Sequence, residues 1–536
     1  MTDAAAAGAR TPGLPPGVRW SIILAVAIQV ALSFVSGWQN RHVLNNPDGV
    51  AYIRSAVYVA QGQFGLSVSG HWGPLLSWMA AGPVRLGADP IPAMRIALGL
   101  SALIFTLGCL SVLRSVQTPP VGLAIGTWLA ALASVVWSSW NITPDVLLAG
   151  LVALASSRLL SGAWRQGPLS AFVTGLVCGA VCLAKPVGLA LILTISTALA
   201  LLSIGLYRLG VREAVRGLAP LALGVAMVAG PWMAILSHKY GSLTFSTSNA
   251  ITRAVVGPPN RREGESYVSR FHVLEAGRIT SWEDPPPHLP DLVSSPLDSP
   301  SYTWYQAKLI RDNTSAALAQ LARFDLVGLG IATAIAGLLL HKPWLSNLRS
   351  ERWRWGGLLV VCVVAPYLPL VVELRYLFPA YPFVLAAAAG TVSWLTSESR
   401  RGLRMLCWGF LALSFGGPLL TSLPAAVGTS SHPSLLHRQI ARRLGESGLQ
   451  GPIAGGRTAG LEIAFFLNQP WYGDEPDATV SRLKASGAKL VVARRDSPLA
   501  AGLEREPGFR NVDAVAFDGS PQAEASGLTL YVRTEP

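Results

Sequence analysis

The chain has 536 residues, of which 51% are hydrophobic and only 13% charged, and its mean hydropathy is +0.43. This composition is too apolar for a soluble protein of several domains and indicates a polytopic α-helical membrane protein. The net charge of +13, from 42 basic and 29 acidic residues, does not require a nucleic-acid partner, because Lys and Arg collect in the cytoplasmic loops of membrane proteins.

Eleven segments are apolar and long enough to cross the ~30 Å of hydrocarbon in a bilayer, so we expect about 11 transmembrane helices. They are residues 19–37, 94–113, 120–138, 143–161, 169–184, 187–206, 214–236, 324–341, 355–372, 377–395 and 403–424. We interpret the first as an uncleaved span, because it has a basic flank but no clear small-residue cleavage site. These segments and their loops make residues 1–429 the predicted transmembrane domain.

Basic residues are abundant in every second loop between the predicted spans and scarce in the others. If the N-terminus is cytoplasmic, the loops on that side carry clusters of Arg and Lys, whereas the short connections on the other side carry only Lys185 and Arg375. This is the positive-inside pattern of a multi-pass protein, which we expect in the plasma (inner) membrane. With eleven spans, it places loops 38–93 and 238–323 and the C-terminus outside the cytoplasm.

The outside loop 38–93 is expected to contain a short helix. Asn46 can cap it, Pro47 suits its first position, and Asp48 in the first turn meets the positive end of the helix dipole. Apolar residues at helical spacing over 50–60 predict an amphipathic helix that lies on the membrane surface. Taken alone, Asp48 is better explained as an ordinary helix-start residue.

The longer outside loop, 238–323, contains a Pro-rich turn region and a predicted helix over 302–323. Its aromatic residues, among them Trp282 and Trp304, favour an ordered element resting on the membrane over a free linker.

Residues 430–536 predict a soluble, extracytoplasmic α/β domain. Its expected elements are a helix over 435–444, a strand over 452–454, helices over 461–467 and 478–486, and strands over 489–493, 512–517 and 528–532. The Gly455-Gly456 pair lacks the spacing of a phosphate-binding loop, so no nucleotide site is expected. Two roles for this domain stay open, recognition of an acceptor and stabilisation of the membrane domain.

Six ionisable residues are predicted at one face of the membrane: Asp48, His71, Asp145, Lys185, Glu373 and Arg375. Each by itself is best explained as a residue at a helix end, but together they indicate a shared site. Carboxylates beside cations suit a reaction in which a carboxylate takes a proton from a nucleophile while cations hold a phosphate leaving group. The sequence contains no HExxH, GxSxG or Cys/His ligand set, so a protease, serine hydrolase or zinc enzyme has no support.

Several short motifs within residues 19–395 carry a resemblance to a known superfamily. They are Asp48 with Tyr52, Ala56 and Gly62, then Gly73-Pro74-Leu75, Thr143-Pro144-Asp145, Ala184-Lys185-Pro186-Val187-Gly188, Pro231-Trp232 with Lys239-Tyr240-Gly241, and Arg375-Tyr376-Leu377 with Pro379-Ala380-Tyr381-Pro382. In this order they resemble the GT-C superfamily of membrane glycosyltransferases, in particular the branch of protein O-mannosyltransferases and lipid A aminoarabinose transferases. One departure is Gly49, which follows Asp48 where many relatives have a second acidic residue.

The resemblance implies a GT-C-like fold and the inverting transfer of a sugar from a polyprenyl-phosphate carrier to an acceptor hydroxyl on the extracytoplasmic face. By the resemblance, Asp48 is the acidic residue that activates or positions the acceptor, and Lys185 and Arg375 bind the donor phosphate. Beside them we expect Asp145 as a second catalytic residue and Tyr376 as a further donor phosphate-binding residue. His71, Trp72 and Glu373 are the expected acceptor- or substrate-binding residues. The expected partners are a polyprenyl-phosphate sugar, membrane lipids and a glycan, lipid or protein acceptor.

No cofactor is certain from the sequence. Carboxylates and phosphate oxygens suit Mg²⁺ or Mn²⁺, but no dedicated ligand set is visible. The alternative function is that of a non-enzymatic transporter or flippase of lipid-linked glycans. Such transporters usually place ionisable groups near the membrane midplane and show a two-fold hydropathy repeat, and this sequence shows neither.

The charge pattern makes a topological prediction. A reporter that works only outside the cytoplasm should be active when it is fused after Leu420 and silent when it is fused near Arg349. The reverse result would place the candidate site on the cytoplasmic side and overturn the assignment of the outside loops.

Overall fold

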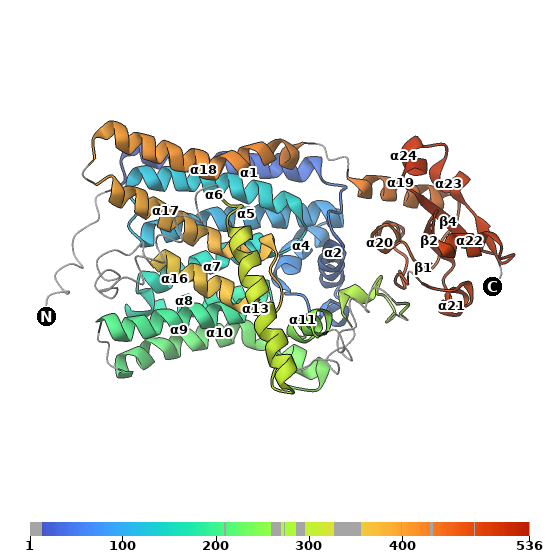
Figure 1. Ribbon diagram of the computed structural model, residues 1–536, viewed down its shortest axis with the longest axis horizontal. Helices are drawn as coiled ribbons and strands as arrows, with labels where there is room; N and C mark the ends of the chain where they lie inside the picture. The colour runs from blue at the N-terminus through green and yellow to red at the C-terminus, as the bar shows by residue number, and fades with distance from the viewer. Residues whose placement is uncertain are drawn as a thin grey trace.

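The computed structural model describes residues 13–207, 211–258, 270–272, 274–285, 295–325, 355–397, 399–428, 432–475 and 477–534. These residues form a bundle of long helices, and the C-terminal segment 432–534 lies at one end of it (Figure 1). Two short helices of loop 38–93, which keeps the name first outside loop from its predicted topology, lie at the same end of the bundle: α2 (Pro47–Ala60) and α4 (Leu75–Arg85).

Ten helices overlap ten of the eleven predicted spans, one of them only in part. They are α1 (Pro16–Gln39), α5 (Pro90–Ser115), α6 (Pro120–Trp140), α7 (Asp145–Leu160), α8 (Pro168–Ala184), α9 (Gly188–Tyr207), α10 (Val211–Tyr240), α16 (Trp355–Val364), α17 (Tyr381–Leu395) and α18 (Arg401–Val427). The span predicted over 324–341 lies outside the described residues from position 326 onward. Two short helices, α3 (Phe64–Ser67) and η2 (Ala163–Arg165), lie in connections.

Among the described residues, six helical stretches are long and apolar enough to cross a membrane, judged by length and composition. They are residues 16–39, 90–115, 120–140, 215–240, 374–394 and 401–427. The apolar helices α8, α9 and α16 are shorter than these.

The span predicted over 355–372 is wrong in its second half. After α16 comes a 3₁₀ turn at Ala365–Tyr367, and the chain is then irregular until the 3₁₀ helix η7 (Leu374–Ala380). Pro366 and Pro369 explain the break, because proline cannot donate the helical hydrogen bond and its ring clashes with the preceding turn.

Small residues allow neighbouring helices to approach closely. A Cβ atom added to Gly108 of α5 would lie 2.6 Å from the carbonyl oxygen of Gly150 in α7. Such close approach is typical of helix packing in membranes, where van der Waals contact takes over from the hydrophobic effect. Because Asp145 is the first residue of α7, this packing also fixes the position of its carboxylate.

The helix predicted in the loop 38–93 is present as α2, but its apolar face packs against protein and not against lipid. Its apolar residues, such as Val50, are fully buried against protein. They are covered by α4, by the short helix η3 (Ser281–Glu283) and by the C-terminal helix α20 (Arg457–Leu467). The expected contact of this face with lipid is wrong, because helical periodicity marks an apolar face without showing whether lipid or protein covers it.

Asn46 occupies the predicted N-cap position of α2, but its side chain makes no capping bond. Its Oδ1 instead accepts a hydrogen bond from the N–H of Ile142, 2.9 Å away. The preceding Asn45 donates to the carbonyl of Ser139 and accepts from Arg95 of α5 at 2.6 Å. The start of α2 is therefore tied to the turn between α6 and α7.

Loop 238–323, which keeps the name second outside loop from its predicted topology, contributes α11 (Ser248–Val256) and α13 (Pro300–Leu321). Helix α13 agrees with the helix predicted over 302–323. Tyr305 of α13 donates to the carbonyl of Val256 at 2.8 Å, and Gln306 donates to that of Pro369 at 2.9 Å. Helix α13 therefore fastens the end of α11 to the irregular segment that follows α16.

The C-terminal segment contains a four-stranded sheet in the order β1-β2-β4-β3, in which β1 and β2 run parallel and the other pairs antiparallel. Besides α20, its elements are α19 (Pro433–Glu446), β1 (Ile453–Ala454), α21 (Val480–Ser486), β2 (Leu490–Arg494), α22 (Pro498–Glu504), β3 (Phe509–Asn511), α23 (Asp513–Phe517), α24 (Pro521–Ala525) and β4 (Leu528–Arg533). The strand predicted over 512–517 is wrong, because most of these residues form α23. Asn511 explains the change, since its Oδ1 accepts from the N–H of Asp513 in a turn that ends β3 and starts the helix.

Candidate active site

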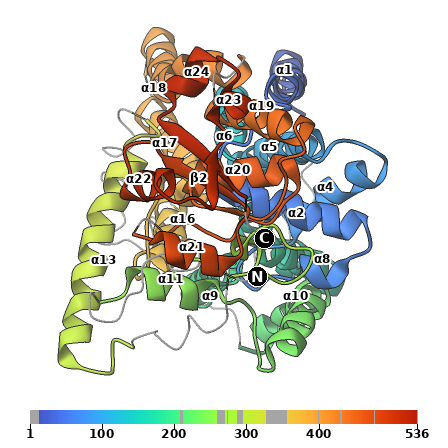
Figure 2. The ribbon, with the colours of Figure 1, turned by 90° about the vertical axis from the view of Figure 1, so that its right-hand side faces the viewer.

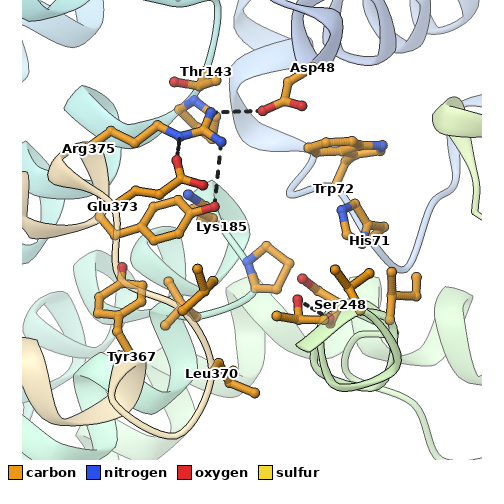
Figure 3. A pocket seen from close by; sticks show the side chains of 18 of the residues that line it. Asp48, His71, Trp72, Thr143, Lys185, Ser248, Tyr367, Leu370, Glu373 and Arg375 are labelled. Atoms are coloured by element: carbon orange, nitrogen blue, oxygen red, sulfur yellow. Dashed lines mark hydrogen bonds and ion pairs between the residues drawn. The ribbon is translucent and has the colours of Figure 1, made fainter. Parts of the chain in front are cut away.

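A cavity of about 370 Å³ lies between α2, α11 and the segments that follow α8 and α16 (Figure 3). Part of its lining is apolar, with Ile251 and Val255 of α11 and with Leu370 and Val371 after α16. The rest is polar or aromatic and includes seven of the eight site residues expected from the sequence: Asp48, His71, Trp72, Lys185, Glu373, Arg375 and Tyr376. The eighth, Asp145, bonds to Lys185 from outside this lining.

Asp48 and Arg375 form an ion pair in the wall of this cavity. Arg375 Nη1 lies 2.8 Å from Asp48 Oδ2, and its Nε lies 2.7 Å from Glu373 Oε2 (Figure 3). The first turn of α2 presents Asp48, whereas Glu373 and Arg375 stand at the start of η7. One guanidinium therefore joins the first outside loop to the turn before α17.

Lys185 is paired with Asp145. Its Nζ lies 2.5 Å from Asp145 Oδ1, and Asp145 is only 1% exposed. Burial lowers the pKa of Lys185, and the Asp145 carboxylate opposes this shift. Because a buried carboxylate without a partner is strongly destabilising, this pair also holds the start of α7 against the turn after α8.

Tyr376 lies against both cations. The centre of its ring is 4.1 Å from Lys185 Nζ and 5.2 Å from the guanidinium carbon of Arg375. On this ring stacks Tyr367, with the ring centres 5.4 Å apart and the planes 10° from parallel. Aromatic faces attract cations, so the ring lowers the cost of holding two positive charges close together. Tyr367 was not predicted as a site residue because it lay in an expected span, although the prolines beside it signal a turn.

Trp72, His71 and Trp282 form an aromatic group beside Asp48. The ring centres of His71 and Trp72 are 4.4 Å apart, and those of Trp72 and Trp282 are 4.9 Å apart. Trp282 Nε1 donates to Asp48 Oδ1 at 3.3 Å, and Trp72 Nε1 donates to the carbonyl of Trp282 at 2.7 Å. Trp282 was expected only to order its loop, since nothing in the sequence places position 282 against position 48.

His71 is kept neutral by its surroundings. Burial lowers its pKa from 6.5 to about 4, and the carboxylate of Asp48 opposes this shift. A neutral imidazole cannot attract a phosphate as a cation. It can, however, donate one hydrogen bond and accept another, which suits contact with a hydroxyl group.

Gly73 allows the loop that carries His71 and Trp72 to pack closely against the end of α8. A Cβ atom at position 73 would overlap the carbonyl oxygens of Leu183 and Ala184. Glycine permits this close approach of two backbones, and the approach brings the aromatic group next to the turn that carries Lys185.

A second cavity of about 390 Å³ shares Asp48, Glu373 and Arg375 with the first. Its other lining residues come from the start of α2, the α6–α7 turn and the start of η7: Asn46, Pro47, Trp140, Asn141 and Leu374. The three shared residues therefore stand in the wall between the two cavities.

The described part of the chain contains no group of three or more His, Cys, Asp or Glu side chains that could hold a metal ion. The two carboxylates in the lining of the first cavity, Asp48 and Glu373, are both engaged by Arg375. The Mg²⁺ or Mn²⁺ considered from the sequence is therefore not assigned to this cavity.

Two solved structures resemble this one over nearly the whole chain. ArnT from Cupriavidus metallidurans in the apo state matches with a TM-score of 0.57 and 16% identity, covering 96% of this chain and 98% of that one. The same protein bound to undecaprenyl phosphate matches with a TM-score of 0.55 and 16% identity, covering 95% and 97%. No protein-family model and no curated protein sequence matches the chain. Because ArnT has the GT-C fold, the fold predicted from the sequence motifs is confirmed.

The burial of His71 predicts a dependence of stability on pH. Its pKa is about 4 in the folded protein and 6.5 without burial, so the unfolded chain takes up a proton first as the pH falls. Stability is then lost between pH 6.5 and 4. The melting temperature of the purified protein should fall over this window, and His71→Gln should remove part of the fall. An unchanged fall in the variant would contradict a buried, neutral imidazole.

Proposed function

We propose that this protein, which has the GT-C fold, is a glycosyltransferase that moves a sugar from a polyprenyl-phosphate carrier to an acceptor hydroxyl. The observation that carries the proposal is the Asp48–Arg375 pair in the wall between two cavities. At this place the carboxylate of Asp48 can take a proton from an acceptor in one cavity, while Lys185 and Arg375 bind the phosphate of a donor in the other. The positive-inside pattern supports placing this chemistry on the extracytoplasmic face of the plasma membrane.

The first cavity suits a polyprenyl-phosphate sugar as the donor. Lys185 and Arg375 supply positive charge for the phosphate, and the apolar residues of α11 and of the segment after α16 suit a prenyl chain. Trp72 and Trp282 offer aromatic faces and His71 a neutral hydrogen-bonding group for the sugar. The solved complex of ArnT with undecaprenyl phosphate supports this choice of donor, because the two chains share a fold.

The second cavity suits the acceptor. Asn46 and Asn141 bring amide groups, and Glu373 brings a carboxylate that is about half exposed. Amides and carboxylates beside an aromatic ring favour a polyhydroxylated acceptor, such as a glycan, over an acyl chain. Asp145 is too buried to meet either substrate, so its role in this proposal is to hold Lys185.

In the proposed reaction, the acceptor oxygen attacks the anomeric carbon of the sugar from the side of the second cavity. Asp48 accepts the hydroxyl proton while the new carbon–oxygen bond forms. The bond between the anomeric carbon and the phosphate oxygen breaks, and its electron pair leaves with the phosphate. Lys185 and Arg375 stabilise the negative charge that grows on this leaving group. Attack and departure on opposite faces of the sugar invert its anomeric centre.

The substitution Asp48→Asn tests whether Asp48 is the general base of the proposed reaction. Asn keeps the size of the side chain and an oxygen that can accept from Arg375, but it cannot take the proton. We expect the transfer rate to fall at least ~100-fold while donor binding stays nearly normal. The measurement is release of polyprenyl phosphate by purified protein from a panel of polyprenyl-phosphate sugars. A flippase of lipid-linked glycans would bind such donors without releasing it.

Asp89→Asn is the matched control for this test. Asp89 also stands at a helix start in the same outside loop, but it is exposed and lines neither cavity. The Asp89→Asn variant should therefore keep the turnover rate of the wild type. Near-normal turnover by folded Asp48→Asn would instead leave Asp48 as a helix-start residue and move the base to Glu373, the other carboxylate that lines both cavities.

A paired substitution tests the phosphate role of Lys185. Lys185→Gln should weaken donor binding about tenfold or more, but it also leaves Asp145 buried without a cation. Combining it with Asp145→Asn restores an uncharged, hydrogen-bonded pair. The double variant should therefore regain thermal stability without regaining donor affinity. Donor affinity that returns together with stability would show that Lys185 serves only to neutralise Asp145.

A further inference from the structure

Residues 277–285 of the second outside loop are fastened to α2. The Tyr58 hydroxyl oxygen lies 2.7 Å from Glu283 Oε2 and 2.8 Å from the carbonyl oxygen of Gly277. Glu283 Oε1 accepts from the N–H of Ile279 at 2.9 Å, which closes a tight turn around the carboxylate. Glu283 is buried, so these bonds are shielded from water and are stronger than bonds at the surface.

Residues 272 and 279 of the same loop are joined to the C-terminal segment by backbone hydrogen bonds. The N–H of Trp471 donates to the carbonyl of Ile279 at 2.6 Å, and the N–H of His272 donates to that of Tyr472 at 2.7 Å. Tyr472 in turn donates from its N–H to the carbonyl of Ile453 in β1 at 2.9 Å. The loop is therefore hydrogen-bonded to Trp471 and Tyr472, which in turn lie along the edge strand β1 of the C-terminal sheet.

Arg54 joins all three parts. From α2, its guanidinium donates to Asn468 Oδ1 at 3.1 Å and to the carbonyl of Gly277 at 3.3 Å. Figure 2 views the molecule from this end and shows the C-terminal segment in front of the helix bundle, with α20 close to α2, in agreement with their contact.

These bonds place Trp282 against the proposed base. Its indole N–H donates to Asp48 Oδ1, while Arg375 holds Oδ2. Two donors from different elements fix the plane of the carboxylate. Each oxygen still has a lone pair for an incoming hydroxyl, because a carboxylate offers about four acceptor positions.

We propose that the C-terminal segment is a positioning element for Asp48: it holds residues 277–285, and through them Trp282 sets the orientation of the carboxylate. This inference rests on the proposed function of Asp48 as the base. It makes Trp282 a positioning residue, and it gives the C-terminal segment a part in catalysis that does not depend on contact with an acceptor.

Trp282→Phe tests the link between the loop and the base. Phe keeps an aromatic ring in the group but removes the N–H that Asp48 accepts. We expect kcat to fall about tenfold with the donor Kd within about twofold of wild type, because misorientation of a base costs rate rather than binding. Trp304→Phe is the matched control, since Trp304 lies in the same outside loop but is 74% exposed on α13. The Trp304→Phe variant should change neither kcat nor the donor Kd.

Asn468→Gly tests the link between the C-terminal segment and the loop. Asn468 has a φ of 52°, which glycine adopts without strain, so the variant loses only the oxygen that accepts from Arg54. Hydrogen–deuterium exchange of the peptide 274–285 should become faster, and kcat should fall about threefold. The fall should not add to that of Trp282→Phe, because both variants disturb one path. Asn468→Asp keeps an acceptor for Arg54 and should behave as the wild type does.

Each of three results would overturn the inference: wild-type kcat in Trp282→Phe, unchanged exchange in Asn468→Gly, or faster exchange in Asn468→Gly with unchanged kcat. If the wild-type protein released no polyprenyl phosphate, the proposed function would fall and the inference with it. An active wild-type protein with any of the three results would overturn the inference alone.

Discussion

The ion pair between Asp48 and Arg375 is the interaction on which the rest of the site depends. It joins the first outside loop to the turn before α17, and its guanidinium also holds Glu373 at 2.7 Å. Both partners are about one-fifth exposed, so the pair is shielded more than a surface ion pair, which contributes little. Asp48 is thus held by Arg375, by Trp282 and by an α2 whose start is tied to Ile142. A carboxylate fixed in this way between two cavities is suited to receive a proton from one defined direction.

Each cation of the site is matched by a carboxylate, Lys185 by Asp145 and Arg375 by Asp48 and Glu373. This pairing offsets the large cost of removing charges from water. It also means that a phosphate meets cations that are already oriented and need little rearrangement. Such preorganised charge stabilises a leaving group most when its own negative charge grows, which is the condition for accelerating bond cleavage rather than only binding substrate.

The site is assembled by close backbone contacts as much as by side chains. Gly73 lets the aromatic loop rest on the end of α8, and the bonds of Trp471 and Tyr472 join the C-terminal sheet to the second outside loop. Buried backbone N–H and C=O groups must be paired, so these contacts help to fix where Trp72 and Trp282 lie. The C-terminal segment is in this way continuous with the wall of the first cavity.

The sequence by itself determined the helices of the bundle and the group of charged residues at one face. Apolar length predicts helices well, and the cost of charge in hydrocarbon leaves few positions for residues such as Lys185 and Arg375. The pairing of these residues, the burial of α2 and the place of Trp282 were decided only by the tertiary structure. Contacts between positions tens to hundreds of residues apart leave no period in the sequence, and an apolar helix face looks the same whether lipid or protein covers it. The break after α16 is a different case, because Pro366 and Pro369 were visible but the hydropathy of the surrounding residues outweighed them.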